Sequence, residues 1–249
     1  MELREVIGRR RSIRFLLPYK PVEPEKIQRM LEAARLASHW GNVQSLRAVV
    51  VFRDTAPKDV MDAITAPIAG YQIRLAPVVI VWYLDTTAVD EQADRLRELL
   101  RAGALGFGEG KHEALEKQLI PIFGNLLEKL KEPGLGEVDC GQGIAQATLV
   151  AFEQGLGTCC LGSPNADKIR EKLGMPETCR ILLLQTVGYP AESPTPVASA
   201  RASPSRSSST RTATDSRSRA TRTWSPSSSA TACCSARRPR PGARRSSST

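Results

Sequence analysis

The stretch PVVIVWYL, residues 77–84, contains no charged side chain and indicates a buried β-strand. Two further stretches have a similar character, LRAVVVF at 46–52 and RILLLQTVGY at 180–189. Helical patterns surround these strands, at 24–37, 57–65, 89–102, 112–131 and 141–155. Because the connections are too irregular for repeated βαβ units, the sequence predicts one α+β domain that ends near Pro194.

Two of the helical patterns predict how the helices pack. One apolar face runs through residues 24–37, at Ile27, Met30, Leu31, Ala34 and Ala37. The other pattern, GQGIAQATLVAFEQG at 141–155, is rich in glycine and alanine. Such small residues favour close packing against another helix, and a second subunit is a candidate for that partner.

The positive charge of this protein is concentrated at its C-terminal end. The 249-residue chain has a formal net charge of +9. Residues 197–249 contain eleven arginines and one acidic residue, whereas residues 1–196 contain 24 basic and 25 acidic residues. An argument from the overall charge to nucleic-acid binding therefore concerns the tail alone.

The tail itself, residues 195–249, is composed mostly of Ser, Arg, Ala, Thr and Pro. Beyond Val197 it has no Ile, Leu, Met or Phe, so it cannot bury enough apolar area to fold, and we expect disorder. A frameshift after about residue 194 is a second explanation. Read out of frame, residues 213–225 permit Tyr-Gly-Gln-Pro-Phe-Pro-Arg-Asp-Pro-Asp-Val-Val, which resembles an ordinary protein segment; sequencing the gene decides between the two.

Several classes of protein and site are disfavoured by the sequence. The N-terminus lacks the apolar region of a secretory signal, and no apolar run is long enough to span a bilayer. The six cysteines have no C-x-x-C spacing, which argues against a disulfide scaffold. With only two histidines in the chain, a Cys/His zinc site is also disfavoured. The segment GALGFGEGKH at 103–112 has Leu105 and His112 where a phosphate-binding loop needs Gly and Ser or Thr. We therefore expect a cytoplasmic, reduced, metal-free protein.

Three segments are candidates for ligand binding. In GRRRSIRF, residues 8–15, guanidinium groups and a serine hydroxyl suit a phosphate, although a solvated basic helix end explains them as well. The amides of Asn42 and Gln44 suit a ring with alternating imide donors and acceptors, or a turn and a strand cap. The glycine-rich turn at 155–162 allows the backbone to approach a planar ligand. Within that turn, Cys159 and Cys160 are candidate nucleophiles or small core residues.

Four segments in this order resemble the nitroreductase family of FMN-dependent NAD(P)H oxidoreductases, over residues 1–194. They are RRSIRF (10–15), ASHWGNVQSLRAVVV (37–51), GQGIAQATLVAFEQGLGTCCLG (141–162) and LLLQTVGYPAESP (182–194). The resemblance implies a mostly antiparallel central sheet flanked by helices, and a homodimer with FMN at the subunit interface. It also implies NADH or NADPH as hydride donor and a small organic acceptor, such as a nitroaromatic or a quinone, in a ping-pong cycle. The flavin would then carry the chemistry, with no catalytic acid or base from the protein.

The resemblance also assigns cofactor-binding residues near the N-terminus and at the glycine turn. It places Arg10, Arg11 and Ser12 at the FMN phosphate. Arg14 would lie nearer N1 and the C2 carbonyl of the flavin. Leu161 and Gly162 complete this part of the expected site.

A loop at 38–44 supplies the other expected contacts. The resemblance places Ser38, Asn42 and Gln44 along the isoalloxazine ring. The family's proline before the serine is Ala37 here, and its Pro-Trp after the glutamine is replaced by Ser45 and Leu46. His39 and Trp40 are therefore unusual candidates for contact with the substrate.

The C-terminal end departs further from the family. Relatives continue beyond the VGYP motif with a basic segment that completes the phosphate site and a strand that embraces the partner subunit. Read out of frame, residues 195–206 permit Gly-Gly-Gln-Arg-Pro-Arg-Leu-Pro-Phe, which looks like the missing segment. Two alternatives to an active reductase stay open at this point. One is a polyanion or nucleic-acid binder that uses the tail, and the other is a flavoprotein inactivated by its altered C-terminus.

Overall fold

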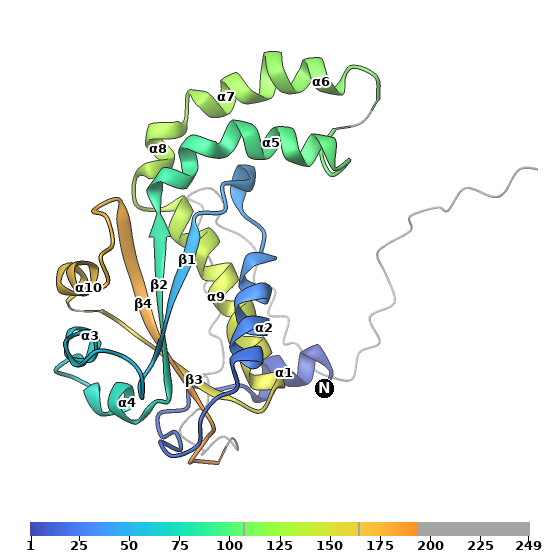
Figure 1. Ribbon diagram of the computed structural model, residues 1–249. Coiled ribbons are helices and arrows are strands. Elements are labelled where there is room, and N and C mark those ends of the chain that lie inside the picture. The colour runs from blue at the N-terminus through green and yellow to red at the C-terminus, as the bar shows by residue number, and fades with distance from the viewer. Residues whose placement is uncertain (107, 164, 194–249) are drawn as a thin grey trace, which may run out of the picture. The chain divides into compact units, whose positions relative to one another are not determined.

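The computed structural model describes residues 1–106, 108–163 and 165–193. The expected disorder or frameshift of residues 195–249 lies outside these residues. Within them, one antiparallel sheet has the strand order β1-β2-β4-β3 (Figure 1). The strands are β1 (Leu46–Phe52), β2 (Val78–Asp85), β3 (Gly157–Leu161) and β4 (Cys179–Gly188). The three long strands expected from the sequence and the antiparallel sheet are confirmed.

Helices pack on both sides of this sheet, and a further group projects from it. In chain order the helices are α1 (Leu3–Arg9), α2 (Pro24–Arg35), α3 (Lys58–Ile64), α4 (Gly70–Leu75), α5 (Gln92–Arg101), α6 (Lys111–Ala114), α7 (Ile120–Gly124), α8 (Leu127–Lys131), α9 (Leu135–Glu153) and α10 (Ala166–Lys172). Three shorter turns are η1 (Trp40–Asn42), η2 (Thr86–Glu91) and the π-helical η3 (Leu115–Leu119).

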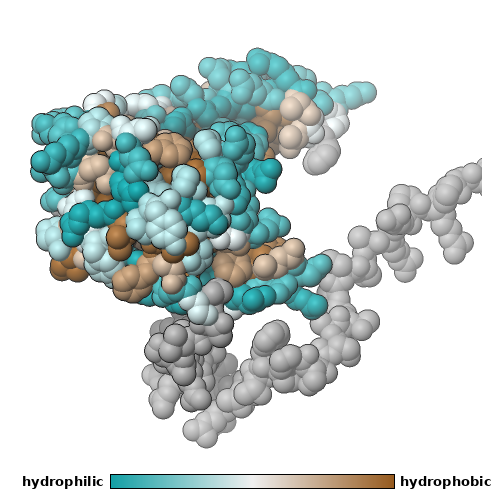
Figure 2. Space-filling model, turned by 60° about the horizontal axis from the view of Figure 1, so that its bottom comes forward, coloured by the Kyte–Doolittle hydropathy of each residue, from teal (hydrophilic) through white to brown (hydrophobic). Residues whose placement is uncertain are grey.

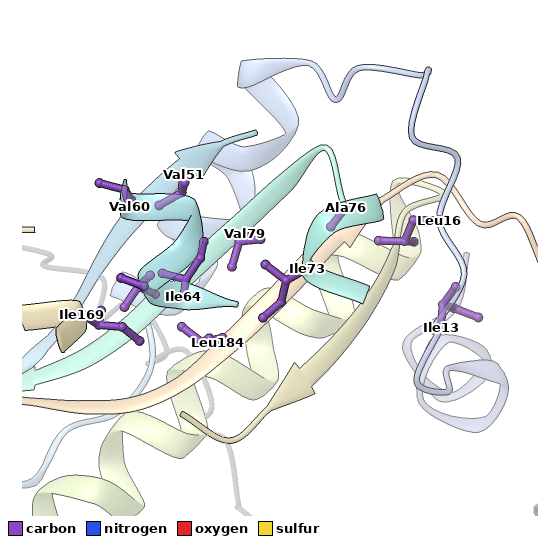
Figure 3. Close-up of a cluster of buried hydrophobic side chains, with 12 residues drawn as sticks. Ile13, Leu16, Val51, Val60, Ile64, Ile73, Ala76, Val79, Ile169 and Leu184 are labelled. Atoms are coloured by element: carbon purple, nitrogen blue, oxygen red, sulfur yellow. The ribbon is translucent and has the colours of Figure 1, made fainter. Parts of the chain in front are cut away.

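Alternation along β2 divides the core into two layers, because successive side chains of a strand point to opposite faces. Val79 and Val81 join a cluster that α3, α4 and α10 cover, with Ile64, Ile73 and Ile169 among its members (Figure 3). Ile80 and Trp82 join the second cluster, under α2 and α9. The domain is therefore a sheet between two helical layers, as expected for the α+β class.

The central strands also hold a buried polar chain. The Trp82 indole Nε1 donates to Gln185 Oε1 at 2.8 Å, and Gln185 Nε2 donates to the Thr148 hydroxyl at 2.9 Å. All three side chains are buried. Because each of these groups finds a partner, the polar atoms do not weaken the core.

Helix α9 packs closely on α2 of the same chain. Gly143, Ala147 and Ala151 lie on its buried side. A Cβ added at Gly143 would lie 2.5 Å from a methyl of Leu46 and 3.0 Å from the Ala34 carbonyl oxygen. The helix that the small residues were expected to contact is thus α2. The helix also begins at Leu135, six residues before the expected start, with Glu137 accepting a hydrogen bond from the Gly134 N–H at 2.6 Å.

The stretch between β2 and α9 is less regular than the sequence suggests. Residues 112–131 read as one helix, but the structure has α6, η3, α7 and α8 in succession. Pro121 lacks a donor and Gly124 favours a helix end, which accounts for the breaks. The stretch between β2 and α9 projects from the sheet and packs mainly on itself through Leu96, Leu100 and Leu115 (Figure 1).

Helix α4, which precedes β2, was not expected from the sequence.

Among the described residues, no helix combines the length and apolarity needed to cross a membrane. The same part of the chain contains no group of three or more His, Cys, Asp or Glu placed to hold a metal ion.

Candidate functional site

The arginine segment leaves the end of α1 as an extended chain beside β3. The Ile13 N–H donates to the Thr158 carbonyl at 2.9 Å, and Leu16 forms an isolated bridge with Pro190. Ile13 and Leu16 are buried in the core, so Arg14 and Phe15 between them are exposed. Burial of the two apolar side chains therefore fixes which way the arginines point.

Arg11 is held by the end of the described chain. Its guanidinium donates to a Glu192 carboxylate oxygen at 3.2 Å and also to the Ser193 carbonyl. The same carboxylate accepts the backbone N–H groups of Arg14 at 2.5 Å and Phe15 at 3.2 Å. Burial raises the pKa of Glu192, but these N–H groups and the Arg11 charge outweigh it and hold the pKa below 4.5. Arg11 is thus occupied within the protein, although it was expected at a phosphate.

Arg9, Arg10 and Arg14 are exposed cations of this segment, and Arg9 pairs with Glu5 at 2.7 Å. Arg10 and Cys160 line a hollow of about 440 Å³, together with Ile7 of α1 and Gly141 and Ala145 of α9, among others. A volume of 300–1,000 Å³ is typical of small-molecule sites. The hollow thus has a cationic rim and an apolar wall.

The glycine turn lies beside the same segment. Ser12 and Arg14 lie close enough to Cys159 to influence its thiol, and Leu161 and Gly162 follow two residues further along. Burial raises the pKa of Cys159, which disfavours the reactive thiolate. This supports the prediction that Cys159 is a small core residue over the alternative that it is a nucleophile. The structure therefore brings together the N-terminal and glycine-turn parts of the expected site.

The second candidate segment, 38–44, is tied to the helices around it. The Trp40 N–H donates to the buried carboxylate of Asp139 at 2.7 Å. The Trp40 ring meets Phe123 edge to face, with centroids 4.7 Å apart. The Gly41 carbonyl accepts from Gln92 Nε2 at 3.2 Å. Trp40 therefore packs against α7 and α9 within the subunit, and its expected contact with a substrate stays a prediction.

Asn42 and Gln44 occupy strained backbone positions, with φ of 55° and 52°. Gln44 Nε2 donates to Asn42 Oδ1 at 2.8 Å, and Gln44 Oε1 accepts from Arg95 Nη1 at 3.1 Å. Arg47 donates to the Gln44 carbonyl at 2.5 Å. Hydrogen bonds from outside the loop thus hold a conformation that non-glycine residues rarely adopt.

His39 lies beside a second hollow, of about 230 Å³, while Ser38 before it is exposed. Arg35, Gln44 and Arg47 line this hollow as well. His39 Nδ1 is buried and has no hydrogen-bond partner among the described residues. Burial lowers the pKa of His39 below 6.5, with the nearby Asp139 charge opposing the shift. The imidazole is therefore neutral at neutral pH.

The two parts of the expected site lie apart in the subunit. In Figure 1 the loop that contains η1 lies beside α5, whereas α1 lies near the opposite end of α9. The contacts of residues 38–44 run to Gln92, Arg95 and Asp139, and those of the arginine segment run to β3 and Glu192. Within one subunit, the two segments are therefore held by different elements.

Four residues that position these segments were not identified from the sequence: Gln92, Arg95, Asp139 and Glu192. Each acts on a partner between 51 and 181 positions away in the chain. Gln92, Arg95 and Asp139 look like ordinary polar helix residues in the sequence. Glu192 lies inside the LLLQTVGYPAESP motif, but the motif assigns it no role. Only the tertiary fold reveals their partners.

Comparisons with known proteins identify relatives of this chain. The model of the nitroreductase family matches residues 7–189. An NADH dehydrogenase from Thermus thermophilus is 29% identical over 188 residues, which cover 76% of this chain and 86% of that protein.

Solved structures are similar as well. A candidate nitroreductase from Exiguobacterium sibiricum in complex with FMN superposes with a TM-score of 0.66 at 23% identity, covering 79% of this chain and 92% of that one. A candidate NAD(P)H:FMN oxidoreductase from Staphylococcus epidermidis gives a TM-score of 0.64 at 17% identity, covering 77% and 88%. At these identities the likeness shows the shared fold.

Proposed function

The chain belongs to the nitroreductase family, and from that premise we propose that it is an FMN-dependent oxidoreductase. It takes a hydride from NADH or NADPH and passes the electrons to a small organic acceptor, such as a quinone or a nitroaromatic. When bound, FMN supplies this hydride and electron chemistry. The protein supplies the binding, the orientation and the charge around the ring.

The hollow beside α1 is the observation that carries this proposal. Its rim bears Arg10, and its wall is formed by small and apolar residues of α9. Guanidinium groups bind phosphate, and flat apolar walls suit an aromatic ring. Arg10 and Ser12 would hold the phosphate, and Arg14 would place a positive charge near the pyrimidine edge of the ring. Leu161 and Gly162 would contact the same ligand from the end of β3.

Arg11 has a different part in this arrangement. Because its guanidinium already pairs with Glu192, it would shape the segment rather than meet the phosphate directly. Glu192 also holds the backbone of Arg14 and Phe15, which fixes the spacing between Arg10 and Arg14.

The 38–44 loop would contact the flavin across a subunit interface. Within one subunit this loop is held by α5 and α9, whereas the arginine segment is held by β3 and Glu192, so we assign the partner's loop to the flavin of this subunit. The outer face of α9 suits such a dimer: Val138 is 63% exposed, and Gly141 and Ala145 beside it are small. Separately from α9, the face of the molecule drawn in Figure 2 has hydrophobic side chains at the surface between hydrophilic ones. A two-fold dimer would bury the outer face of α9 and complete two equivalent sites.

Flavin binding tests the proposal directly. Purified protein titrated with FMN should quench the flavin fluorescence, and the complex should oxidise NADH or NADPH when a quinone or nitroarene is present. The double variant Arg10→Ala, Ser12→Ala should bind FMN at least about tenfold more weakly, since charged hydrogen bonds to the phosphate are lost. Arg4→Ala, at an exposed arginine of α1, serves as the control. Protein that takes up no FMN would refute the proposal.

A further inference from the structure

We propose that Arg95 of α5 is a positioning residue that determines which atom of the Asn42 amide is presented to a ligand. The inference rests on the proposed function, because it takes the 38–44 loop to contact the flavin. It concerns the direction of the hydrogen bonds that reach Asn42.

The direction follows from the chemistry of arginine. A guanidinium has five N–H donors and no acceptor. Arg95 Nη1 lies 3.1 Å from the Gln44 side chain, so the Gln44 atom there must be the accepting oxygen. Its other end is then the amide nitrogen, which donates to the Asn42 side chain at 2.8 Å. The Asn42 atom that receives this bond must be its oxygen.

Arg95 thereby determines the orientation of the Asn42 amide through Gln44, without contacting Asn42 through these two hydrogen bonds itself. With Oδ1 directed at Gln44, the group on the other side of the Asn42 amide is Nδ2, a donor of two hydrogen bonds. The loop therefore recognises a hydrogen-bond acceptor, such as a ring carbonyl oxygen. An imide N–H placed at the same position would meet another donor and be rejected.

Arg95 is itself firmly held. Its side chain is only 16% exposed, and Nη2 pairs with Glu91 at 2.5 Å. Its Nε is buried without a hydrogen-bond partner among the described residues. Burying a guanidinium with an unsatisfied nitrogen is unfavourable in a position that serves packing alone. Fixing the loop, whose Asn42 and Gln44 both have positive φ, is a role that justifies it.

Three variants separate this role from a general structural one. Arg95→Met removes the donor, and Arg95→Lys keeps a donor at the same place. In Gln44→Glu, the new carboxylate still accepts from Arg95, and the Arg95 charge balances its negative charge. The carboxylate has no N–H, so it can no longer donate to Asn42. The Asn42 amide should then turn over and present its oxygen. Arg101→Met, an exposed arginine of the same helix, is the matched control.

The readouts are the affinity for FMN, measured by fluorescence titration, and the melting temperature. Arg95→Met and Gln44→Glu should each weaken FMN binding about tenfold or more, while Arg95→Lys stays within about threefold. Gln44→Glu should keep the melting temperature of the parent, because the buried guanidinium remains paired. Gln44→Glu protein that binds FMN like the parent would overturn the proposal.

A measurement without flavin separates this inference from the proposed function. In the free protein, the side-chain NH₂ signal of Gln44 should shift in ¹⁵N NMR spectra when Arg95 is replaced by Met, and should not shift in Arg101→Met. A parent protein that binds no FMN would refute the proposed function. An unshifted Gln44 signal would refute the positioning role of Arg95.

Discussion

His39 gives the fold a dependence on pH that can be measured. Burial lowers its pKa in the folded state below the usual 6.5, and the charges of Arg47 and Arg95 add to the effect against Asp139. The unfolded chain therefore takes up a proton first as the pH falls. The free energy of unfolding should decrease as the pH drops below about 6.5, since the unfolded state binds more protons there.

Urea unfolding between about pH 7.5 and pH 5.5 checks this expectation. His39→Gln should flatten the pH dependence in that window, because it removes the group that titrates. His112, the other histidine of the chain, lies exposed on α6 and provides the control as His112→Gln. Identical pH profiles for His39→Gln and the parent would exclude His39 as the cause.

Glu192 connects the end of the last strand to the arginine segment, so its replacement should lower the free energy of unfolding. Its carboxylate accepts from two backbone N–H groups and from Arg11. Glu192→Gln keeps an acceptor but removes the charge, so the free energy of unfolding near neutral pH should fall by about 1–2 kcal/mol. Glu25→Gln, at an exposed acid, should change little.

Glu192 makes the fold less stable in acid, as His39 does, but for a different reason: hydrogen bonds and the Arg11 charge stabilise its charged form. Because its pKa is lowered in the folded state, its contribution is present above pH 4.5 and is lost as the pH falls through the folded value. The difference in stability between the parent and Glu192→Gln should therefore shrink in acid. A difference that persists unchanged at low pH would show that Glu192 contributes through packing instead.

At the scale of elements, the contact between α2 and α9 depends on Gly143. A methyl group there would overlap Leu46 and the Ala34 carbonyl, so the two helices would have to move apart. Gly143→Ala should lower the free energy of unfolding by about 1–3 kcal/mol despite the better helix propensity of alanine. Gly8→Ala in α1, where an added Cβ meets no atom within 4 Å, should be neutral or slightly stabilising. Equal effects of the two substitutions would contradict the close packing.

The regular elements were largely readable from the sequence, because each follows a local pattern. β1 covers the expected residues 46–52, and α2 begins at Pro24 as the proline indicated. Local sequence patterns did not predict the element boundaries that depend on tertiary packing. The start of α9 at Leu135 and the broken helices after α5 depend on contacts with Leu84 and on small local clusters, which the sequence does not display.

The candidate site was readable only in part, for a related reason. Its segments could be located from motifs, since arginines, amides and glycines stand at characteristic spacings. Their partners could not, because Arg11 meets Glu192 and Gln44 meets Arg95 through the tertiary fold. The sequence also does not show that the arginine segment and the 38–44 loop are held by different elements, which is the observation that leads us to propose a composite site.

At the scale of the whole molecule, the outer face of α9 should govern assembly. Ala145→Arg places a charge in the middle of that face, so it should shift the protein from dimer to monomer in sedimentation experiments. The exposed surface of α10 offers a control, Lys168→Arg. Because Ala145 is exposed within the subunit, the circular dichroism spectrum should stay unchanged. A dimer that survives Ala145→Arg would place the interface elsewhere.

The central claim is that each flavin site combines Arg10 and Ser12 of one subunit with Asn42 of its partner. Subunit mixing tests it most directly. The variant Arg10→Ala, Ser12→Ala and the variant Asn42→Ala should each bind FMN weakly when pure. Refolded together in equal amounts, they should recover about one quarter of the parent's FMN sites, because each mixed dimer contains one intact site. A mixture that binds no more FMN than the two separate variants would contradict the composite site.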